Sequence, residues 1–373
     1  MTVDAQSSFS GTRPVADAHA FDIGKMTDYM REHVDGFSGQ LNVEQFKGGQ
    51  SNPTFLLEAG GRRYVMRRKP PGTLLPSAHA VDREFRVIQA LACTDVPVPQ
   101  AYALCEEADV IGSSFYLMEY VEGRIFWNSS LPDLPVCERG ALYEEMNRVI
   151  AALHSVDPVA VGLADYGKQG NYIERQVARW TKQYRASETE RIEAADCLID
   201  WLPKHIPASS GERRIVHGDY RLDNAIFHPT EPRILAVLDW ELSTLGDSLA
   251  DFAYHCMTWR LAPYRGRGLA GIDLEALGIP DEASYLRRYL QRVSRTSSDA
   301  VSEADWGYYL VFNLFRLVGI MQGVMSRALQ GNASSALALE TGKRARPLAD
   351  QAWALAQEID SVRGAATDGR NSI

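Results

Sequence analysis

The feature that most constrains this chain is a pair of short apolar runs inside an otherwise helical region. The runs AIF and RILAVL lie within residues 214–240, are rich in β-favouring residues and are bounded by Pro and Asp. Helical periodicity flanks them on both sides. The helices that it predicts are 142–154, 172–186, 284–296, 306–329 and one after Arg346. A strand pair among helices is unusual, and the residues around it indicate that the pair positions chemically active side chains.

The first third of the chain has the pattern of a small antiparallel sheet. The runs NVEQF, TFLLEA and RYVMRRK are separated by Gly48-Gly49 and then by Gly60-Gly61. The second glycine pair predicts a hairpin with a two-residue turn. Two further strands are expected at 101–105 and 115–120. One helix interrupts the sheet, with Ser77 as its expected N-cap. Its apolar face is formed by Val81, Phe85, Ile88 and Leu91.

Composition excludes several classes of protein. The 373 residues are 45% hydrophobic and 23% charged, which is typical of a globular protein. With 39 Lys and Arg against 48 Asp and Glu, the formal net charge is −9, so the overall field repels phosphate. We therefore expect neither nucleic acid nor a membrane as partner. The N-terminus lacks a signal-peptide pattern, and polar residues interrupt the apolar stretch 310–325. A soluble, cytoplasmic protein is expected, with 1–24 as a flexible leader and 361–373 as a polar tail.

The strongest chemical pattern is HGDYRLDN, from His217 to Asn224, followed by LDWE from Leu238 to Glu241. A carboxylate on a tight loop, Asp219, can accept a proton from a hydroxyl group. An amide oxygen of Asn224 and the carboxylate of Asp239, brought together by the strand pair, can hold Mg²⁺. Since two protein ligands leave most of the metal's shell to waters and phosphates, the pattern favours a Mg–nucleotide over a bare ion. Each residue alone is common in turns, so the prediction depends on the combined spacing.

These motifs resemble the catalytic and metal-binding loops of the aminoglycoside phosphotransferase and choline kinase-like family, which shares the protein kinase fold. Gly218 and Trp240 replace the Arg and Phe that protein kinases have at these places. The resemblance covers about residues 40–350 and includes GGQSNPTF, RRKPPG, LDWELSTLGD and ALQGNASS. It is strongest to a bacterial group that is also similar to the kinase-like domain fused to some animal acyl-CoA dehydrogenases. The chain has no Gly-x-Gly-x-x-Gly pattern for a flavin or nicotinamide.

The resemblance implies an α+β, bilobal, protein kinase-like fold. Residues 25–121 would form a small N-lobe with the antiparallel sheet, and 122–360 a larger helical C-lobe. ATP and Mg²⁺ are the implied cofactors, and the implied reaction transfers the γ-phosphate to a hydroxyl group of a small molecule. Asp219 would act as the base, with Asn224 and Asp239 as the metal ligands.

The nucleotide site implied by the family begins at the glycine-rich loop. Gly48, Gly49 and Ser51 are expected to cover the phosphates, because glycines allow backbone N–H groups to approach them. On the third strand, alternation places two residues on one face, where Val65 would cover the adenine and Arg67 would face the phosphates. Arg67 departs from the Lys of protein kinases but keeps the charge.

Four further residues complete the implied nucleotide and catalytic sites. Glu84 on the following helix is expected to pair with Arg67, with Asp82 as the competing candidate. Glu119 and Val121 would form the hinge that binds the adenine edge through backbone groups. Arg221, two residues after Asp219, is expected to neutralise charge on the transferred phosphoryl group.

The acceptor is expected to be a small hydroxylated molecule that carries negative charge. Arg260, Arg265 and Arg316 stand out in an acidic chain, in segments that build the acceptor pocket in this family, and arginine commonly recognises carboxylate or phosphate. A hydroxy acid or an acyl-CoA-linked hydroxy acid is favoured. Solvated surface arginines are the alternative explanation. An antibiotic kinase and a non-catalytic ATP-binding regulatory module remain alternative functions, while a protein kinase is disfavoured because the Ala-Pro-Glu element is missing. The chain is expected to be a monomer or a homodimer.

Overall fold

The computed structural model describes most of the chain as two compact units. The described residues are 11–47, 52–70, 80–208, 213–293, 301–332 and 337–368. The first unit comprises Met1–Ala164, His217–Ser243 and Thr258–Val293, and the second comprises Asp165–Val216, Thr244–Met257 and Ser294–Ile373. The expected phosphate-loop residues Gly48, Gly49 and Ser51 and the expected N-cap Ser77 lie outside the described residues.

The first unit contains a six-stranded antiparallel sheet in the order β1-β2-β3-β4-β6-β5. Its strands are β1 (Thr12–Arg13), β2 (Asn42–Phe46), β3 (Thr54–Ala59), β4 (Arg62–Arg68), β5 (Ala101–Cys105) and β6 (Phe115–Glu119). The predicted two-glycine hairpin is confirmed, because β3 pairs with β4 along its whole length. Gly60 and Gly61 have φ angles of 56° and 75°, the left-handed backbone that a mirror-image hairpin turn requires.

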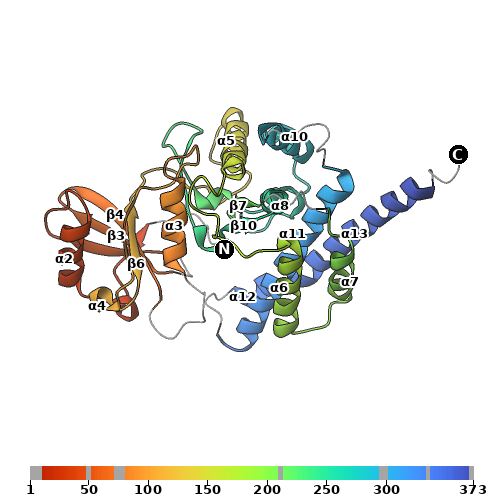
Figure 1. Ribbon diagram of the computed structural model, residues 1–373. Helices are drawn as coiled ribbons and strands as arrows, with labels where there is room; N and C mark the ends of the chain where they lie inside the picture. The colour runs from red at the N-terminus through yellow and green to blue at the C-terminus, as the bar shows by residue number, and fades with distance from the viewer. Residues whose placement is uncertain are drawn as a thin grey trace. The chain divides into compact units, whose positions relative to one another are not determined.

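The two faces of β4 meet different surroundings. Tyr64 and Met66 point into an apolar core that includes Met26 and Met30 of α2 (Ile23–His33). Because side chains alternate along a strand, Arg67 points to the opposite face, where it contacts Glu84 of α3 (Val81–Leu91). The sheet therefore lies between α2 and α3 (Figure 1).

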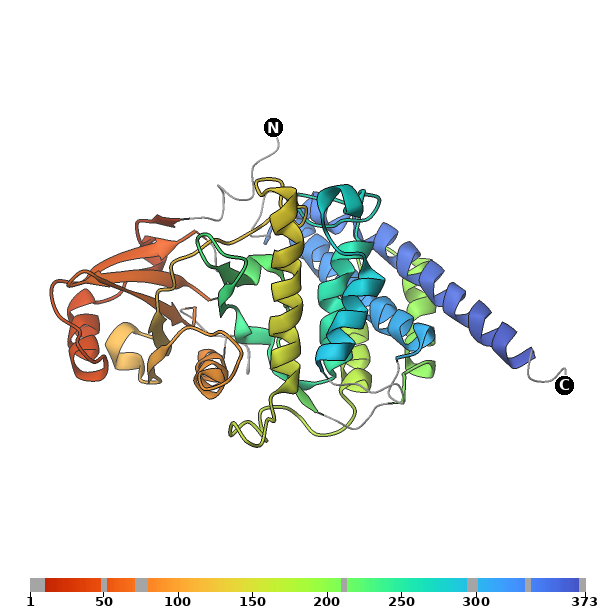
Figure 2. The same ribbon diagram turned by 90° about the horizontal axis from the view of Figure 1, so that it is seen from above.

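The helices of the first unit follow the predicted pattern with shifted ends. The N-cap residue of α3 is Ala80, whose side chain makes no capping hydrogen bond. Val81, Ile88 and Leu91 are buried as predicted, whereas Phe85 is half-buried. Further helices of this unit are η1 (Asp17–His19), α4 (Ala108–Ile111), α5 (Val136–Ser155), α9 (Leu274–Leu277) and α10 (Glu282–Arg292). Figure 2 shows α5 as one long straight helix.

The embedded strand pair is also part of the first unit and confirms the predicted hairpin. β8 (Ala225–Phe227) pairs with β9 (Ile234–Val237), beginning at Ala225↔Val237. The short helices η3 (Leu222–Asn224) and η4 (Trp240–Leu242) lie directly before β8 and shortly after β9. The pairing therefore brings the two chemical motifs of the sequence side by side.

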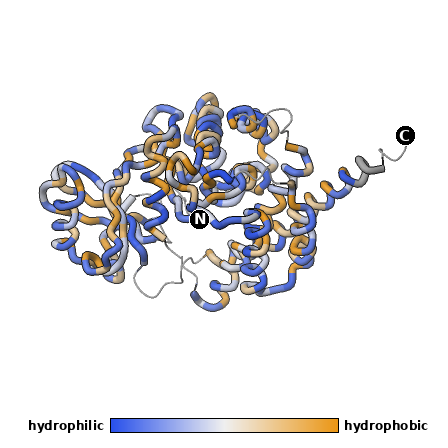
Figure 3. The backbone as a smooth tube through the Cα atoms, in the orientation of Figure 1, coloured by the Kyte–Doolittle hydropathy of each residue, from blue (hydrophilic) through white to orange (hydrophobic). Residues whose placement is uncertain are grey.

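The second unit is mainly helical. Its helices are α6 (Tyr172–Ser187), α7 (Glu193–Trp201), η2 (Leu202–Lys204), α11 (Glu303–Leu329), α12 (Ala338–Gly342) and α13 (Ala345–Asp368). It also contains β7 (Arg214–Val216), which pairs antiparallel with β10 (Thr244–Gly246). The helix α8 (Ser248–Arg260) begins in this unit and ends in the first. In Figure 3 hydrophobic and hydrophilic stretches alternate along the helices, as expected for elements with one buried face.

The long helix α11 forms the core of the second unit. It packs against α6, α7, α12 and α13. By length and composition it could cross a membrane, but 67% of its most apolar window is buried within the protein. The Nδ2 of its buried Asn313 donates hydrogen bonds to the backbone oxygens of Ala250 and Tyr309 at 2.8 and 3.0 Å. The interrupted apolar stretch 310–325 therefore belongs to a mostly buried helix.

The predicted domain boundaries differ from the two compact units. The first unit continues past residue 121 to Ala164 and takes up two later segments. Within the expected leader, β1 pairs with β2, and α2 begins at Ile23. At the other end, α13 continues to Asp368, inside the expected polar tail. The division at 121/122 into functional lobes stays a prediction.

Two leucines on α11 test its role as the core of its unit. Leu314 is 1% exposed and Leu329 is 65% exposed. We expect Leu314→Ala to lower the free energy of unfolding by about 2–5 kcal/mol, because it removes buried methyl groups and leaves a cavity. Leu329→Ala, with the same chemistry, should change it by no more than about 0.5 kcal/mol. Urea unfolding measures both, and equal losses would contradict the assignment.

Candidate active site

The β8–β9 hairpin fixes the distance between the two motif loops. The backbone N–H of Leu238 donates to the backbone oxygen of Asn224 at 2.8 Å, which extends the ladder by one residue beyond Ala225↔Val237. Asn224 thus lies opposite Leu238, and Asp239 follows immediately. The predicted metal ligands are therefore neighbours across a hydrogen-bonded strand pair.

His217 joins the same two loops from inside the protein. Its side chain is fully buried, and its Nε2 lies 2.9 Å from the backbone oxygen of Leu238. Its Nδ1 accepts a hydrogen bond from the backbone N–H of Asp219 at 3.2 Å. Because Nδ1 accepts, the ring proton belongs on Nε2, where it is donated to Leu238. His217 therefore supports both loops through its two ring nitrogens.

Gly218 explains one departure from the protein kinase pattern. Its φ angle is +84°, and a Cβ there would lie 2.8 Å from the backbone oxygen of Leu242. Both the left-handed backbone and this close approach favour glycine. The loop can pass this close to η4 only without a side chain, which is consistent with the absence of the protein kinase Arg.

Asp219 and Asn224 are connected directly. The Nδ2 of Asn224 donates to the backbone oxygen of Asp219 at 2.9 Å and to its Oδ2 at 3.2 Å. Because the amide nitrogen is used in this way, the Oδ1 of Asn224 is the atom that can bind a cation. Arg221 lies beside the same carboxylate, with its Nε 3.3 Å from Oδ1 of Asp219. The Asp219 side chain keeps 17% of its surface exposed, so a hydroxyl group can reach it.

Asp239 has an unusual backbone conformation. Its φ and ψ angles are 65° and 57°, in the left-handed region that Asp and Asn tolerate better than other non-glycine residues. Its Oδ1 lies 2.6 Å from Nη2 of Arg67. Sheet and loop are thus tied together by an ion pair between residues 172 positions apart.

Arg67 is surrounded by three carboxylates. Besides Asp239, its Nε lies 3.1 Å from Glu84 and its Nη2 lies 3.5 Å from Glu241. Asp82, the competing candidate, instead contacts Lys69 at 3.5 Å. The structure therefore brings Arg67 and Glu84 together as expected, and it adds Asp239 as a further partner of Arg67.

Three further residues of this cluster, Asn52, Tyr116 and Glu241, were not predicted from the sequence. The first two donate hydrogen bonds to Glu84, from the Asn52 amide at 2.8 Å and from the Tyr116 hydroxyl group at 3.1 Å. Glu241 is the third carboxylate near Arg67. Two of them could have been found from their positions. Glu241 is the last residue of the LDWE motif, and Tyr116 lies opposite Arg67 in the β4–β6 pairing.

Burial and mutual charge set the protonation of this cluster. Burial raises the pKa of Glu84 to about 7, with Arg67 opposing this shift and Asp239 and Glu241 adding to it. Burial disfavours the charge on Arg67, but Glu84 and Asp239 outweigh it and raise the pKa of Arg67. Burial also disfavours the charge on Asp239, yet Arg67 holds the pKa of Asp239 below its ordinary value. Arg67 and Asp239 are therefore both charged at neutral pH.

The donor set fits a magnesium ion that is bound together with phosphates. Asn224 offers an amide oxygen and Asp239 an ionised carboxylate, the hard oxygen ligands that Mg²⁺ prefers. Within the described ranges, no group of three or more His, Cys, Asp or Glu is arranged to hold a metal. These two oxygens therefore suit an ion that completes its shell with phosphates and water.

The predicted adenine-side residues belong to the same unit. Val65 is buried and pairs with Met118 across the β4–β6 ladder. Glu119 ends β6, and its backbone N–H donates to the backbone oxygen of Gln100 at 2.8 Å. Val121 follows in a half-buried, non-helical segment. Their role at the adenine edge stays a prediction.

The three expected acceptor arginines have different surroundings. Arg260 is engaged in an ion pair with Glu282, with Nη2 3.1 Å from Oε1. Arg265 is exposed on a turn. Arg316 belongs to the second unit, where its buried guanidinium lies 4.3 Å from the ring centre of Tyr254 and 5.3 Å from that of Trp180.

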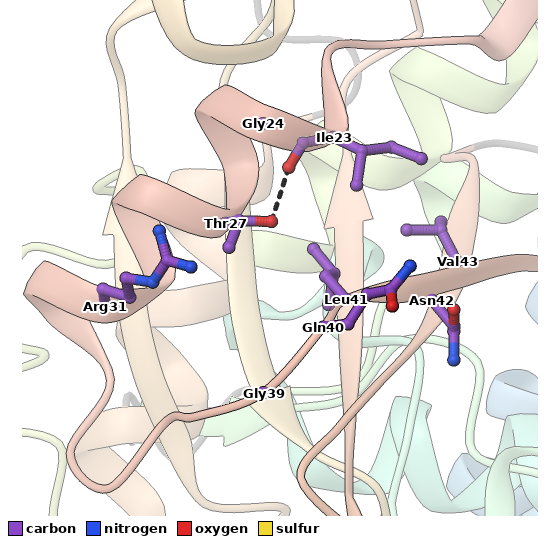
Figure 4. Close-up of a pocket in the computed structure, with 9 residues that line it drawn as sticks. All are labelled: Ile23, Gly24, Thr27, Arg31, Gly39, Gln40, Leu41, Asn42 and Val43. Carbon is purple, nitrogen blue, oxygen red and sulfur yellow. Dashed lines mark hydrogen bonds between the residues drawn. The ribbon is translucent and has the colours of Figure 1, made fainter.

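A hollow in the first unit is unrelated to this site. It lies between α2 and the start of β2, and its lining includes Ile23, Thr27, Arg31, Gln40 and Asn42 (Figure 4). None of the predicted site residues lines it.

Comparison with known proteins identifies the family. A family model described as the phosphotransferase enzyme family matches residues 42–285. The chain belongs to this family. The matched range includes the Arg67 cluster and both motif loops. The expected resemblance to aminoglycoside phosphotransferases and the kinase-like fold are thereby confirmed.

The similarity of this chain to individual known proteins varies widely. A crystal structure from Ralstonia eutropha, provisionally described as an aminoglycoside phosphotransferase, is 57% identical, with a TM-score of 0.83 over 91% of this chain and 99% of that one. Mouse acyl-CoA dehydrogenase family member 10 is 47% identical over 92% of this chain, which spans only 32% of that relative's length. A ternary complex of the phosphotransferase APH(4)-Ia with ADP and hygromycin B shares the fold at 16% identity, with a TM-score of 0.56 over 88% and 97% of the two chains.

Glu84 is expected to make the protein less stable as the pH rises. In the folded state its carboxyl holds a proton up to about pH 7, whereas an ordinary glutamate releases it near 4.5. Between these values the folded state binds more protons than the unfolded state, so the free energy of unfolding falls with increasing pH. Urea unfolding across this range should show the slope in the wild type and a smaller slope in Glu84→Gln. The exposed Glu340→Gln serves as the control, and an unchanged slope in Glu84→Gln would contradict the assignment.

Proposed function

We propose that this phosphotransferase moves the γ-phosphate of ATP to a hydroxyl group of a small molecule. The observation that carries the proposal is the connection of Asp219 to Asn224 and of Asp239 to Arg67 within one unit. A candidate base, two cation-binding oxygens and a buried cation are the groups that this transfer needs.

Each residue has a distinct role in the proposed reaction. Asp219 accepts the proton of the acceptor hydroxyl group while the oxygen of that hydroxyl group forms a bond to the γ-phosphorus. The bond between that phosphorus and the bridging oxygen breaks, ADP leaves, and Asp219 later returns the proton to solvent. Asn224 and Asp239 would hold Mg²⁺, which neutralises phosphate charge when bound. Arg67 and Arg221 offset the negative charge of the phosphates.

The remaining nucleotide contacts are proposed for the sheet and the hinge. Gly48, Gly49 and Ser51 would cover the phosphates, and Val65 would cover the adenine. Backbone groups of Glu119 and Val121 would bind its edge. Glu84 is proposed to keep Arg67 in place, since it is 3.1 Å away and is itself held by Asn52 and Tyr116.

For the acceptor, we propose an anionic hydroxy acid or its acyl-CoA-linked form. The exposed Arg265 is the main support, and the acyl-CoA dehydrogenase names of similar proteins are consistent with it. Arg260 and Arg316 stay proposed acceptor contacts, although Glu282 already neutralises Arg260. An antibiotic acceptor is the alternative, since one neighbour of the same fold holds hygromycin B. We propose a cytoplasmic monomer or homodimer.

Asp219→Asn tests the catalytic proposal. ADP release is measured with Mg–ATP and 2-, 3- or 4-hydroxybutyrate, their CoA thioesters, hygromycin B or kanamycin. We expect the wild type to prefer the anionic series and Asp219→Asn to be roughly 10²–10⁴-fold slower, because it cannot accept the proton. Asp28→Asn, an exposed position on α2, should match the wild type.

Other outcomes of this assay would exclude specific proposals. Undiminished turnover in Asp219→Asn would exclude its role as the base. Efficient phosphorylation of the antibiotics alone would exclude the anionic acceptor. ATP binding without turnover of any acceptor would favour the regulatory module.

Asp239→Asn tests the metal ligand without measuring turnover. ATP should raise the wild-type melting temperature more with Mg²⁺ than with EDTA, because a ligand that binds only the folded state stabilises it. We expect this difference to shrink in Asp239→Asn, since the carboxylate charge is lost while Asn still tolerates the left-handed backbone. A difference equal to that of the wild type would exclude Asp239 as a ligand.

A further inference from the structure

Four side chains of alternating charge contact one another in a row that begins at Asp219. They are Asp219, Arg221, Asp223 and Arg267. Arg221 contacts Asp219 through Nε at 3.3 Å and Asp223 through Nη2 at 3.1 Å. The same Oδ2 of Asp223 accepts a second contact, from Nη2 of Arg267 at 2.7 Å. Asp223 is nearly buried, with 7% of its side chain exposed. Arg267 lies 44 residues further along the chain, so a distant segment reaches the catalytic loop.

That segment is a tight turn at Tyr264–Arg267. The backbone N–H groups of its first and last residues donate to each other's oxygens at 2.7 and 3.0 Å. The two residues between them, Arg265 and Gly266, have φ angles of 53° and 83°. Positive φ at both central positions is what a two-residue mirror-image turn requires. Gly meets this requirement easily, whereas Arg does so against its preference.

A second contact holds the turn from another side. The backbone N–H of Ser129 donates to the backbone oxygen of Gly266 at 2.6 Å. A Cβ at Gly266 would lie 3.3 Å from both the Cα of Asn128 and the backbone oxygen of Trp127. The turn is therefore fixed between the segment 127–129 and the catalytic loop, and Arg267 supplies the side-chain part of that fixation.

The division of Arg221 between two carboxylates matters for Asp219. A lone arginine beside a single aspartate tends to form a close two-pronged pair, which would cover the oxygens that must reach a hydroxyl group. Here Nη2 of Arg221 contacts Asp223 while its Nε lies beside Asp219. Asp223 can hold this position because Arg267 offsets part of its charge and restrains the same oxygen.

We propose that Asp223 and Arg267 are positioning residues for Asp219. They hold Arg221 between Asp219 and Asp223 and attach the Tyr264–Arg267 turn to the catalytic loop. The proposal rests on the proposed function, because it assigns a purpose to Asp219. It adds that Arg265 is presented to the acceptor by a turn whose place depends on the Arg267–Asp223 ion pair. Arg267 itself is a connector and not an acceptor-binding group.

Kinetics with a matched control separates positioning from general stability. Arg267 and Arg288 are both 48% exposed, and each contacts one carboxylate at 2.7 Å, Asp223 and Glu144 respectively. ADP release is measured with the hydroxybutyrate or hydroxybutyryl-CoA that the wild type turns over fastest. For Arg267→Gln we expect kcat to fall roughly tenfold to a hundredfold through misplacement of the base, with KM for ATP unchanged. Arg288→Gln should keep the wild-type kcat.

Conservative replacement and a double variant sharpen the assignment. Arg267 reaches Asp223 through one nitrogen, so Arg267→Lys should restore most of kcat. Asp223→Asn and Arg267→Gln act on one ion pair, so the double variant should lose little more than either single variant. Full additivity, or equal losses in Arg267→Gln and Arg288→Gln, would overturn the proposal.

Limited proteolysis tests the attachment of the turn without any acceptor. Asp223→Asn removes the tie but leaves Arg265 and Arg267 as trypsin sites. We expect cleavage within the turn to be several-fold faster than in the wild type, at an unchanged melting temperature. Glu144→Gln, which releases Arg288 in the same way, should not change cleavage at the turn. Equal cleavage in Asp223→Asn and the wild type would overturn the attachment.

The two readouts distinguish the possible failures. If the wild type turns over no acceptor while Asp223→Asn accelerates cleavage of the turn, the attachment holds but the proposed function and the positioning of a base fail. If the wild type is active and Arg267→Gln retains its kcat, only the positioning proposal fails.

Discussion

The Arg67 guanidinium is the charge on which the arrangement of the first unit depends. It is 90% buried, so it needs negative partners, and three carboxylates from a helix and a loop supply them. One of them, Glu84, is itself held by Asn52 and Tyr116. The sheet, α3 and the loop after β9 are thus joined through one side chain. The same contact keeps Asp239, a candidate metal ligand, ionised and close to the sheet.

The sequence predicted part of this cluster. Alternation along β4 placed Arg67 and Val65 on one face, and the family resemblance implied Arg67 as the cation and Glu84 as its partner. The short strands AIF and RILAVL correctly placed Asn224 beside Asp239. Contacts between distant segments were not predictable in this way. The ion pairs Arg260–Glu282 and Arg267–Asp223 produce no periodic pattern in the sequence, because each depends on how a loop packs against the rest of the unit. The helices α2, α7 and α8 were among those missed.

The comparisons establish a family, while the chemistry of the acceptor rests on local charge. The names of several similar proteins refer to dehydrogenases, but this chain spans only about a third to a half of their length. The matched family model describes a phosphotransferase and includes Arg67, Asp219, Asn224 and Asp239. A name carried over from a larger protein is therefore a weaker guide to this chain than the Asp219–Asn224 pair and the Arg67 cluster.

The register of the β8–β9 hairpin has a consequence for how such proteins diverge. Asn224 and Asp239 are aligned at the open end of the ladder, by Ala225↔Val237 and the Leu238–Asn224 hydrogen bond. The residues that connect the strands, 228–233, lie at the other end and belong to neither loop of the site. Insertions or deletions there can lengthen or shorten the connection while the aligned end stays in place. Homologues with intact chemistry can therefore differ in the number of residues between the asparagine and the aspartate, and searches that demand a fixed interval will overlook them.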